Sequence, residues 1–139
     1  MAEQRSAGVQ TGAVHHARIT VSDPARSREF YTGLLGFEVM MDFPDGVLVT
    51  NGSIFLGLRT APDPVKASPG DRFDPNRPGL DHLTLSVSSR ADLETASEQA
   101  NARGVPCGEI VDFGPQFGFY VLMLEDPDGI QIELVANYA

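Results

Sequence analysis

Two segments of this sequence follow the same pattern, and each contains a histidine at the same place. Aligning His16 on His82 places Val21 on Val87 and Ser22 on Ser88. In both copies a stretch in which every second residue is apolar, typical of a strand, leads into a stretch with helical spacing. We therefore expect a duplicated β-α unit, and a site built between the two copies.

The first copy predicts a β-α-β-β-β order. Its first strand begins at Val14, and its helix runs from Asp23-Pro24, a favourable helix start, to about Thr32. Three short strands follow over residues 38–42, 47–51 and 53–59, separated by the turn signals Pro44-Asp45-Gly46 and Asn51-Gly52. These elements form a first module over residues 14–60.

The rest of the chain divides in the same way. Residues 1–13 are small and polar and are expected to form a flexible arm, and the proline-rich residues 61–79 a linker or lid loop. The second module, 80–139, predicts a strand from Leu80, a helix over about 90–103 and strands near 107–112, 119–124 and 130–136. Residues 14–139 are thus expected to be one α+β domain.

Alternation assigns a face to each side chain in these strands. Ile19 and Val21 belong to the apolar back of the first strand, whereas His16, Arg18 and Thr20 belong to its front. His82, Thr84 and Ser86 repeat this register, and Glu133 lies on the polar face of the last strand. If helices cover the two backs, the fronts turn toward each other and His16, His82 and Glu133 converge as a 2-His-1-carboxylate site for a divalent cation. His15 is expected on the opposite face.

Composition excludes several other kinds of protein. A net charge of -9 argues against a nucleic-acid or anionic-membrane partner. The apolar runs are too short to span a bilayer, and the N-terminus lacks the features of a secretion signal. Cys107 is the single cysteine, so neither an internal disulfide nor a thiolate cluster is possible. We expect a cytoplasmic protein whose partner is a small molecule.

Three segments together resemble the vicinal oxygen chelate superfamily, which includes glyoxalase I, bleomycin resistance proteins and extradiol dioxygenases. They are VHHARITVSDPARSREFYTGLLGFEV, GLDHLTLSVSS and EDPDGIQIELV. The resemblance implies two βαβββ modules that form an open mixed-sheet barrel around a cavity, commonly in a homodimer. It also implies metal ligands at His16, His82 and Glu133.

Two positions depart from particular members of that family. Glyoxalase I takes a fourth ligand from the strand over 53–59, where we align Leu56, whose side chain cannot bind a metal. Many fosfomycin transferases and extradiol dioxygenases place a tyrosine ten positions before the metal glutamate, where this chain has Met123. The sequence therefore favours a three-ligand site and disfavours glyoxalase I chemistry.

Other front-face residues are candidates for contact with a substrate. Arg18 is the candidate catalytic and anion-binding residue, although pairing with Glu133 or another acid would explain it as well. Thr84 is a candidate polar contact or simply a good strand former. Phe119, Val121 and Met123 would form an apolar wall, or part of the core.

Three functions remain open on this sequence. The first is a metal-dependent dioxygenase, lyase or transferase that chelates a small oxygenated substrate, with Fe2+ or Mn2+ expected first and Zn2+ second. The second is a non-catalytic drug or natural-product binder of the bleomycin-resistance type. The third is a family member whose metal ion is only structural.

Overall fold

The computed structural model describes residues 8–139, so residues 1–7 of the expected arm lie outside the described part of the chain. Residues 8–13 are exposed and form neither helix nor strand. Between 8 and 139, none of the helices combines the length and the apolar character needed to cross a membrane.

The first module has the expected element order. Asp23 caps the first helix by accepting hydrogen bonds from the backbone N–H groups of Ala25 and Arg26, at 3.0 and 3.4 Å. This helix is shorter than expected, because its last turn widens into a π-helix that includes Gly33. The elements are β1 (His16–Thr20), α1 (Pro24–Glu29), η2 (Phe30–Leu34), β2 (Glu38–Phe43), β3 (Gly46–Thr50) and β4 (Phe55–Arg59).

The second module repeats this order after the short 3-10 helix η3 (Pro64–Lys66). Its first strand starts later than expected, so that His82 lies immediately before it. The strand expected over 107–112 is reduced to two residues and an isolated bridge between Cys107 and Leu124. The elements are β5 (Leu83–Ser86), α2 (Arg90–Ala102), β6 (Val111–Asp112), β7 (Phe119–Glu125) and β8 (Gln131–Asn137).

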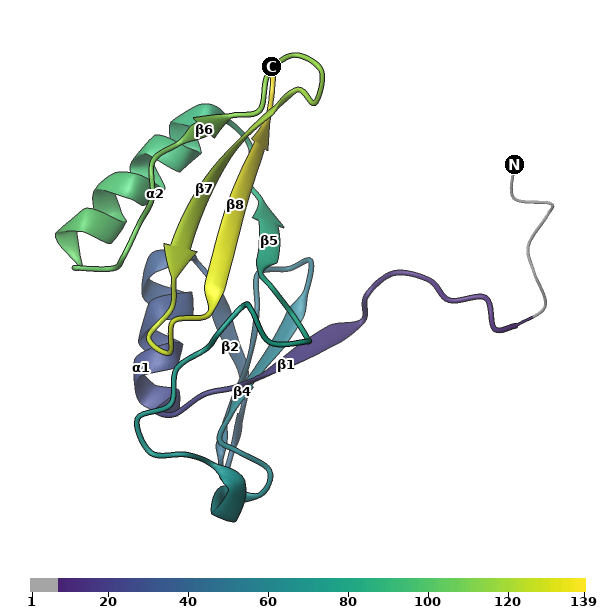
Figure 1. Ribbon diagram of the computed structural model, residues 1–139, viewed down its shortest axis with the longest axis vertical. Helices are drawn as coiled ribbons and strands as arrows, with labels where there is room; N and C mark the ends of the chain where they lie inside the picture. Colours follow the sequence, from purple (N-terminus) through teal and green to yellow (C-terminus); the bar gives the residue numbers. More distant parts are fainter. Residues whose placement is uncertain (1–7) are drawn as a thin grey trace.

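Each module forms one mixed four-stranded sheet, and the two sheets have equivalent topology. Their strand orders are β1-β4-β3-β2 and β5-β8-β7-β6. In each, the first strand pairs in parallel with the last, and all other pairs are antiparallel. The duplication predicted from the two histidine segments is confirmed at the level of the fold (Figure 1).

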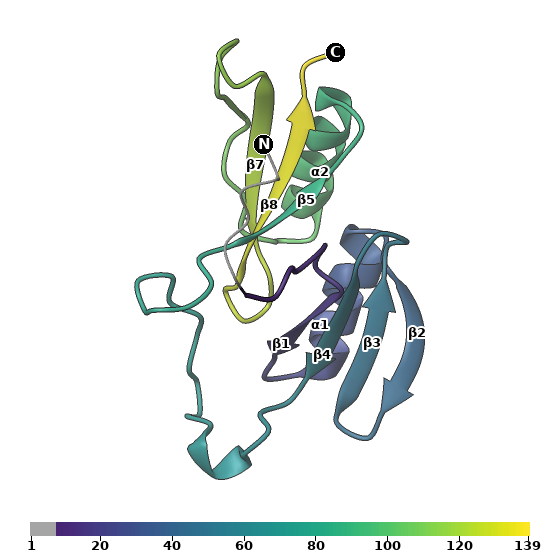
Figure 2. The same ribbon diagram turned by 90° about the vertical axis from the view of Figure 1, so that its right-hand side faces the viewer.

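The predicted apolar backs of the strands form the core. Ile19 and Val21 are buried, as are Ile132 and Leu134 of β8, and Leu83 and Leu85 pack against the same cluster. The opposite faces carry the polar side chains predicted for the site. Figure 2 shows the two sheets one above the other, with α1 and α2 behind them. Within one chain the front faces of the two sheets therefore do not face each other, contrary to the expectation.

A buried contact connects the two modules. The Tyr31 hydroxyl, from η2, donates a 2.9 Å hydrogen bond to Oδ2 of Asp126, while Oδ1 of Asp126 accepts from the N–H groups of Asp128 and Ile130. Burial, together with the adjacent Asp126 charge, raises the pKa of Tyr31 far above its usual range, so the hydroxyl remains a donor. The Asp126-Pro127-Asp128-Gly129 turn is thus attached to the first module.

We predict that Tyr31→Phe destabilises the fold by about 1–3 kcal/mol, because it leaves Oδ2 of a buried carboxylate without its donor. Since the ring is kept, the loss reports on the hydroxyl alone. Urea denaturation of the two proteins measures it, and an unchanged midpoint would show that the hydrogen bond contributes nothing.

The middle of the linker, at residues 72 and 73, is attached to the second module. Phe73 packs against the core, and its N–H donates to the carbonyl of Asp128 at 3.0 Å. Arg72 donates to the carbonyl of Pro127 at 3.3 Å and lies 3.7 Å from a carboxylate oxygen of Glu125. These contacts hold residues 72 and 73 of the linker against the second module.

Candidate functional site

His82 and Glu133 meet on the front of the second sheet. Parallel pairing of β5 with β8 places Thr84 opposite Glu133, and His82 precedes β5 at the same edge. The Nε2 atom of His82 lies 3.7 Å from Oε1 of Glu133, and the Thr84 hydroxyl donates to that oxygen at 3.1 Å. The hydroxyl of Thr84, a candidate for contact with a substrate, thus contacts the candidate ligand Glu133 in this structure.

The other ring nitrogen of His82 is held by Asp81. Its Nδ1 lies 2.8 Å from Oδ1 of Asp81, and the Gln131 amide donates to the Asp81 carbonyl at 2.8 Å. A carboxylate only accepts, so the neutral ring keeps its proton on Nδ1 and presents the Nε2 lone pair toward Glu133. Two electron-pair donors that face each other in this way suit a cation between them. In metal sites, the second ring nitrogen of a histidine ligand commonly donates to a carboxylate, as His82 does here.

The predicted apolar wall lies beside this pair. Met123 is the cross-strand partner of Glu133, and alternation places Val121 and Phe119 on the same face. Val121 is buried but stands outside the main core cluster. Phe119 stacks on Phe113 with ring centroids 5.1 Å apart, and Phe117, 60% exposed, lies next to both. An open aromatic surface therefore lies on the same face of the sheet, four residues along β7 from Met123 and so about 13 Å from the strand position of Glu133.

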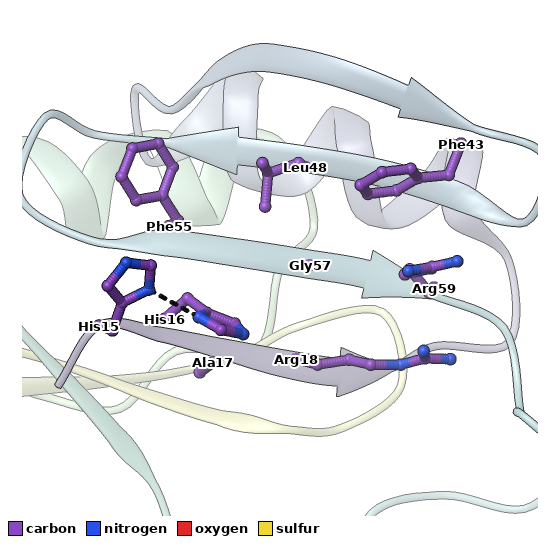
Figure 3. Close-up of a pocket in the computed structure, with 9 residues that line it drawn as sticks. All are labelled: His15, His16, Ala17, Arg18, Phe43, Leu48, Phe55, Gly57 and Arg59. Carbon is purple, nitrogen blue, oxygen red and sulfur yellow. Dashed lines mark hydrogen bonds between the residues drawn. The ribbon is translucent and has the colours of Figure 1, made fainter.

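His16 lies on the front of the first sheet and lines a separate cavity of about 400 Å³. Strands β1, β4, β3 and β2 supply its lining (Figure 3). Phe43, Leu48 and Phe55 give it an apolar surface, and Arg18 and Arg59 give it charge. Every lining residue belongs to the first module.

The expectation for His15 is wrong. Because β1 begins only at His16, strand alternation does not extend to His15, and its ring lines the same cavity. The Nδ1 atoms of the two histidines are 2.8 Å apart (Figure 3), so one of them donates to the other. This contact leaves Nε2 of His16 as the nitrogen available to a ligand.

The alignment of Leu56 with the fourth ligand of glyoxalase I is also wrong. Leu56 is fully buried and pairs with Ala17, on the back of the sheet. Arg18 is the counterpart of Thr84, and the residues paired with them are Gly57 and Glu133. Gly57 therefore occupies the position equivalent to Glu133. Glycine has no side chain to coordinate a metal, so the prediction that disfavours glyoxalase I chemistry now rests on Gly57 and stays a prediction.

The two arginines lie at the end of the cavity away from His15 and His16 (Figure 3). Arg18 donates from Nη2 to the Thr60 carbonyl at 2.9 Å, and takes part in no ion pair within residues 8–139. Arg59 donates from Nε to Asp45 at 2.9 Å and lies 4.4 Å from the centre of the Phe43 ring. The hydrogen bond from Arg59 lowers the pKa of Asp45, which keeps this partner charged.

The three predicted ligands do not assemble within one chain. His82 and Glu133 meet, but the described part of the chain contains no group of three or more His, Cys, Asp or Glu side chains placed to hold an ion. Sequence reasoning also missed Asp81, Phe43, Phe55 and Arg59. The parallel register of β1 with β4 would have placed Phe55 and Arg59 on the front with His16.

Comparison with known proteins agrees with this fold. The sequence pattern of the Glyoxalase/Bleomycin resistance protein/Dioxygenase superfamily matches residues 13–134. The chain belongs to this superfamily.

Individual relatives cover most of the chain. It is 33% identical to the uncharacterized protein YaeR of Escherichia coli (strain K12), over 87% of this chain and 93% of that one. A glyoxylase/bleomycin resistance protein/dioxygenase domain from Frankia sp. EAN1pec has a TM-score of 0.73 at 26% identity, covering 93% of each chain. TnmS3, an antibiotic binding protein from Streptomyces sp. CB03234, shares the fold with a TM-score of 0.65 at 22% identity, covering 94% of this chain and 99% of its own.

Proposed function

We propose that this protein is a divalent-metal-dependent enzyme that chelates a small oxygenated organic substrate through His16, His82 and Glu133. The observation that carries the proposal is the pair formed by Nε2 of His82 and Oε1 of Glu133, with Asp81 fixing the imidazole from behind. Superfamily membership supports it, because the family is named partly for its dioxygenases.

The residues around this pair have distinct roles in the proposal. The ion, Fe2+ or Mn2+ first and Zn2+ second, would act as the Lewis acid that polarises substrate oxygens. Asp81 orients the His82 ring, and Thr84 fixes one oxygen of Glu133 by donating to it. Arg18 binds an anionic group of the substrate, and Met123, which cannot donate a proton, borders the site as an apolar surface.

We further propose that two copies of the chain complete the site as a homodimer. Since His16 stands on a different sheet from His82 and Glu133, the front of the first sheet in one copy would face the front of the second sheet in the other. Large apolar side chains on or beside these fronts favour such a contact: Phe55, Phe113 and Phe117 are 39%, 46% and 60% exposed.

Elemental analysis tests the enzyme proposal directly. Protein purified without chelators is expected to contain about one divalent ion per chain, removable by dialysis against a chelator and restored by Mn2+ or Fe2+. The element that is found identifies the cofactor as Fe2+, Mn2+ or Zn2+. Protein that contains no metal and binds none of the three on titration would refute the proposal.

A second candidate function is non-catalytic sequestration of a planar natural product. The cluster of Phe113, Phe117 and Phe119, in which Phe113 and Phe117 are exposed, favours it, because aromatic surfaces bind flat ligands. TnmS3 shows that the same fold occurs in an antibiotic binding protein. Saturable ligand binding by a protein that holds no metal would favour this function over the enzyme.

A further inference from the structure

The cavity on the first sheet has an apolar middle and a cationic end. Phe43, Leu48 and Phe55 line it, and Gly57 leaves the sheet surface open between them, as Figure 3 shows. A Cβ at Gly57 would come no closer than 3.8 Å to the Arg18 side chain. The absence of a side chain at this central position widens the slot without being required by crowding.

The two arginines of the cationic end share one acid, Asp45, whose pKa is lowered chiefly by its hydrogen bond from Arg59 and less by the charge of Arg18. Asp45 balances Arg59 at 2.9 Å, whereas the described partner of Arg18 is a backbone carbonyl, which is neutral. Arg59 bonds Asp45 through Nε, so its two terminal nitrogens remain available as donors. The excess of positive charge at this end contrasts with the chain as a whole, which carries a net charge of -9. The end of the cavity is therefore suited to one monoanionic group.

The register of the strands gives the length of the slot. His16 pairs with Phe55, and Arg59 lies four residues further along β4, which is about 13 Å at 3.3 Å per residue. Arg18 lies two residues beyond His16 on β1, about 7 Å away. A ligand that reaches from His16 to the guanidinium groups must be extended by one ring or more.

We propose that this cavity binds a flat, apolar organic acid whose carboxylate lies between Arg18 and Arg59 and whose opposite end points toward His16. The part of the inference that places metal-chelating oxygens at the His16 end rests on the proposed function. A planar guanidinium matches a carboxylate by two parallel hydrogen bonds. A phosphate dianion fits less well, because only one positive charge is left unbalanced at this end.

Binding of trans-cinnamate and of its neutral analogue cinnamamide tests the inference. Both have the same flat apolar body, so the difference in their dissociation constants isolates the carboxylate. Calorimetry or NMR titration is expected to show cinnamate binding about tenfold more tightly. Equal affinities, or no binding of either compound, would overturn the proposal.

Three variants locate the effect. Arg18→Gln should abolish the preference for cinnamate, whereas Arg26→Gln, an exposed arginine of α1, should leave it intact. Gly57→Val should weaken the binding of both compounds to the same extent, because the new side chain fills the middle of the slot. A preference that survives Arg18→Gln, or affinities untouched by Gly57→Val, would place the ligand elsewhere.

Titration before and after removal of metal separates this inference from the proposed function. The preference for cinnamate should persist in protein dialysed against a chelator, because guanidinium groups cause it. A preference that disappears with the metal would mean that the carboxylate binds the ion, and would overturn the inference alone. Protein that takes up no metal yet prefers cinnamate would overturn the proposed function alone.

Discussion

Protein with Glu133→Gln is expected to lose its divalent ion, with affinity falling by at least about 100-fold, more than is usual for loss of a residue that only supports a ligand. The amide is nearly isosteric with the carboxylate but carries no charge, and its NH₂ group cannot coordinate. His82→Ala should have an equal effect, because it removes the nitrogen that lies 3.7 Å from Glu133. Metal titration followed by calorimetry, with activity once a substrate is known, measures both losses.

Two further variants show whether the effect is specific. Asp81→Asn should lower the affinity for the metal by about 10–100-fold, because it changes only the group that orients His82. Glu98→Gln, on the exposed surface of α2, removes the same charge far from the site and should change nothing. Retention of tight, stoichiometric metal by His82→Ala would contradict the assignment of the ligands.

A heterodimer of His16→Ala and His82→Ala chains is expected to bind about half as much metal as the wild-type dimer, although each variant alone binds almost none. If each site takes His16 from one copy and His82 from the other, one site of the heterodimer receives both substitutions. The second site then receives neither, and remains intact.

Co-expression of the two variants with different affinity tags allows the heterodimer to be purified and its metal content measured. If each site were contained within one chain, the heterodimer would bind almost no metal, because each of its chains would carry a substitution in its own site. Zero metal in the heterodimer would therefore refute a shared site, and so would a protein that stays monomeric at the concentration of the assay.

The duplicated fold could be predicted from the sequence because its signals are local. Alternation placed Ile19 and Leu134 in the core and His16 and Glu133 on the opposite faces, as observed. The two modules, their helices and their antiparallel strands followed from turn residues and helix caps. These properties depend on residues close together in the chain.

What could not be predicted depends on relations between distant segments. The position of one sheet relative to the other follows from contacts such as Tyr31 with Asp126, which no periodicity reveals. The misplacement of Leu56 had a similar cause, because a shift of one residue in strand register exchanges the two faces. His15 was assigned to the wrong face because alternation was extended past the start of β1.

The equivalence of Gly57 and Glu133 has a consequence for the evolution of this fold. If the proposed metal site is correct, one substitution at either of these two equivalent positions is enough to change the number of ligands around the ion. Glycine at this place also leaves open the part of the cavity that a longer side chain would occupy. In a duplicated scaffold of this kind, new chemistry can thus arise by removing a side chain as readily as by adding one.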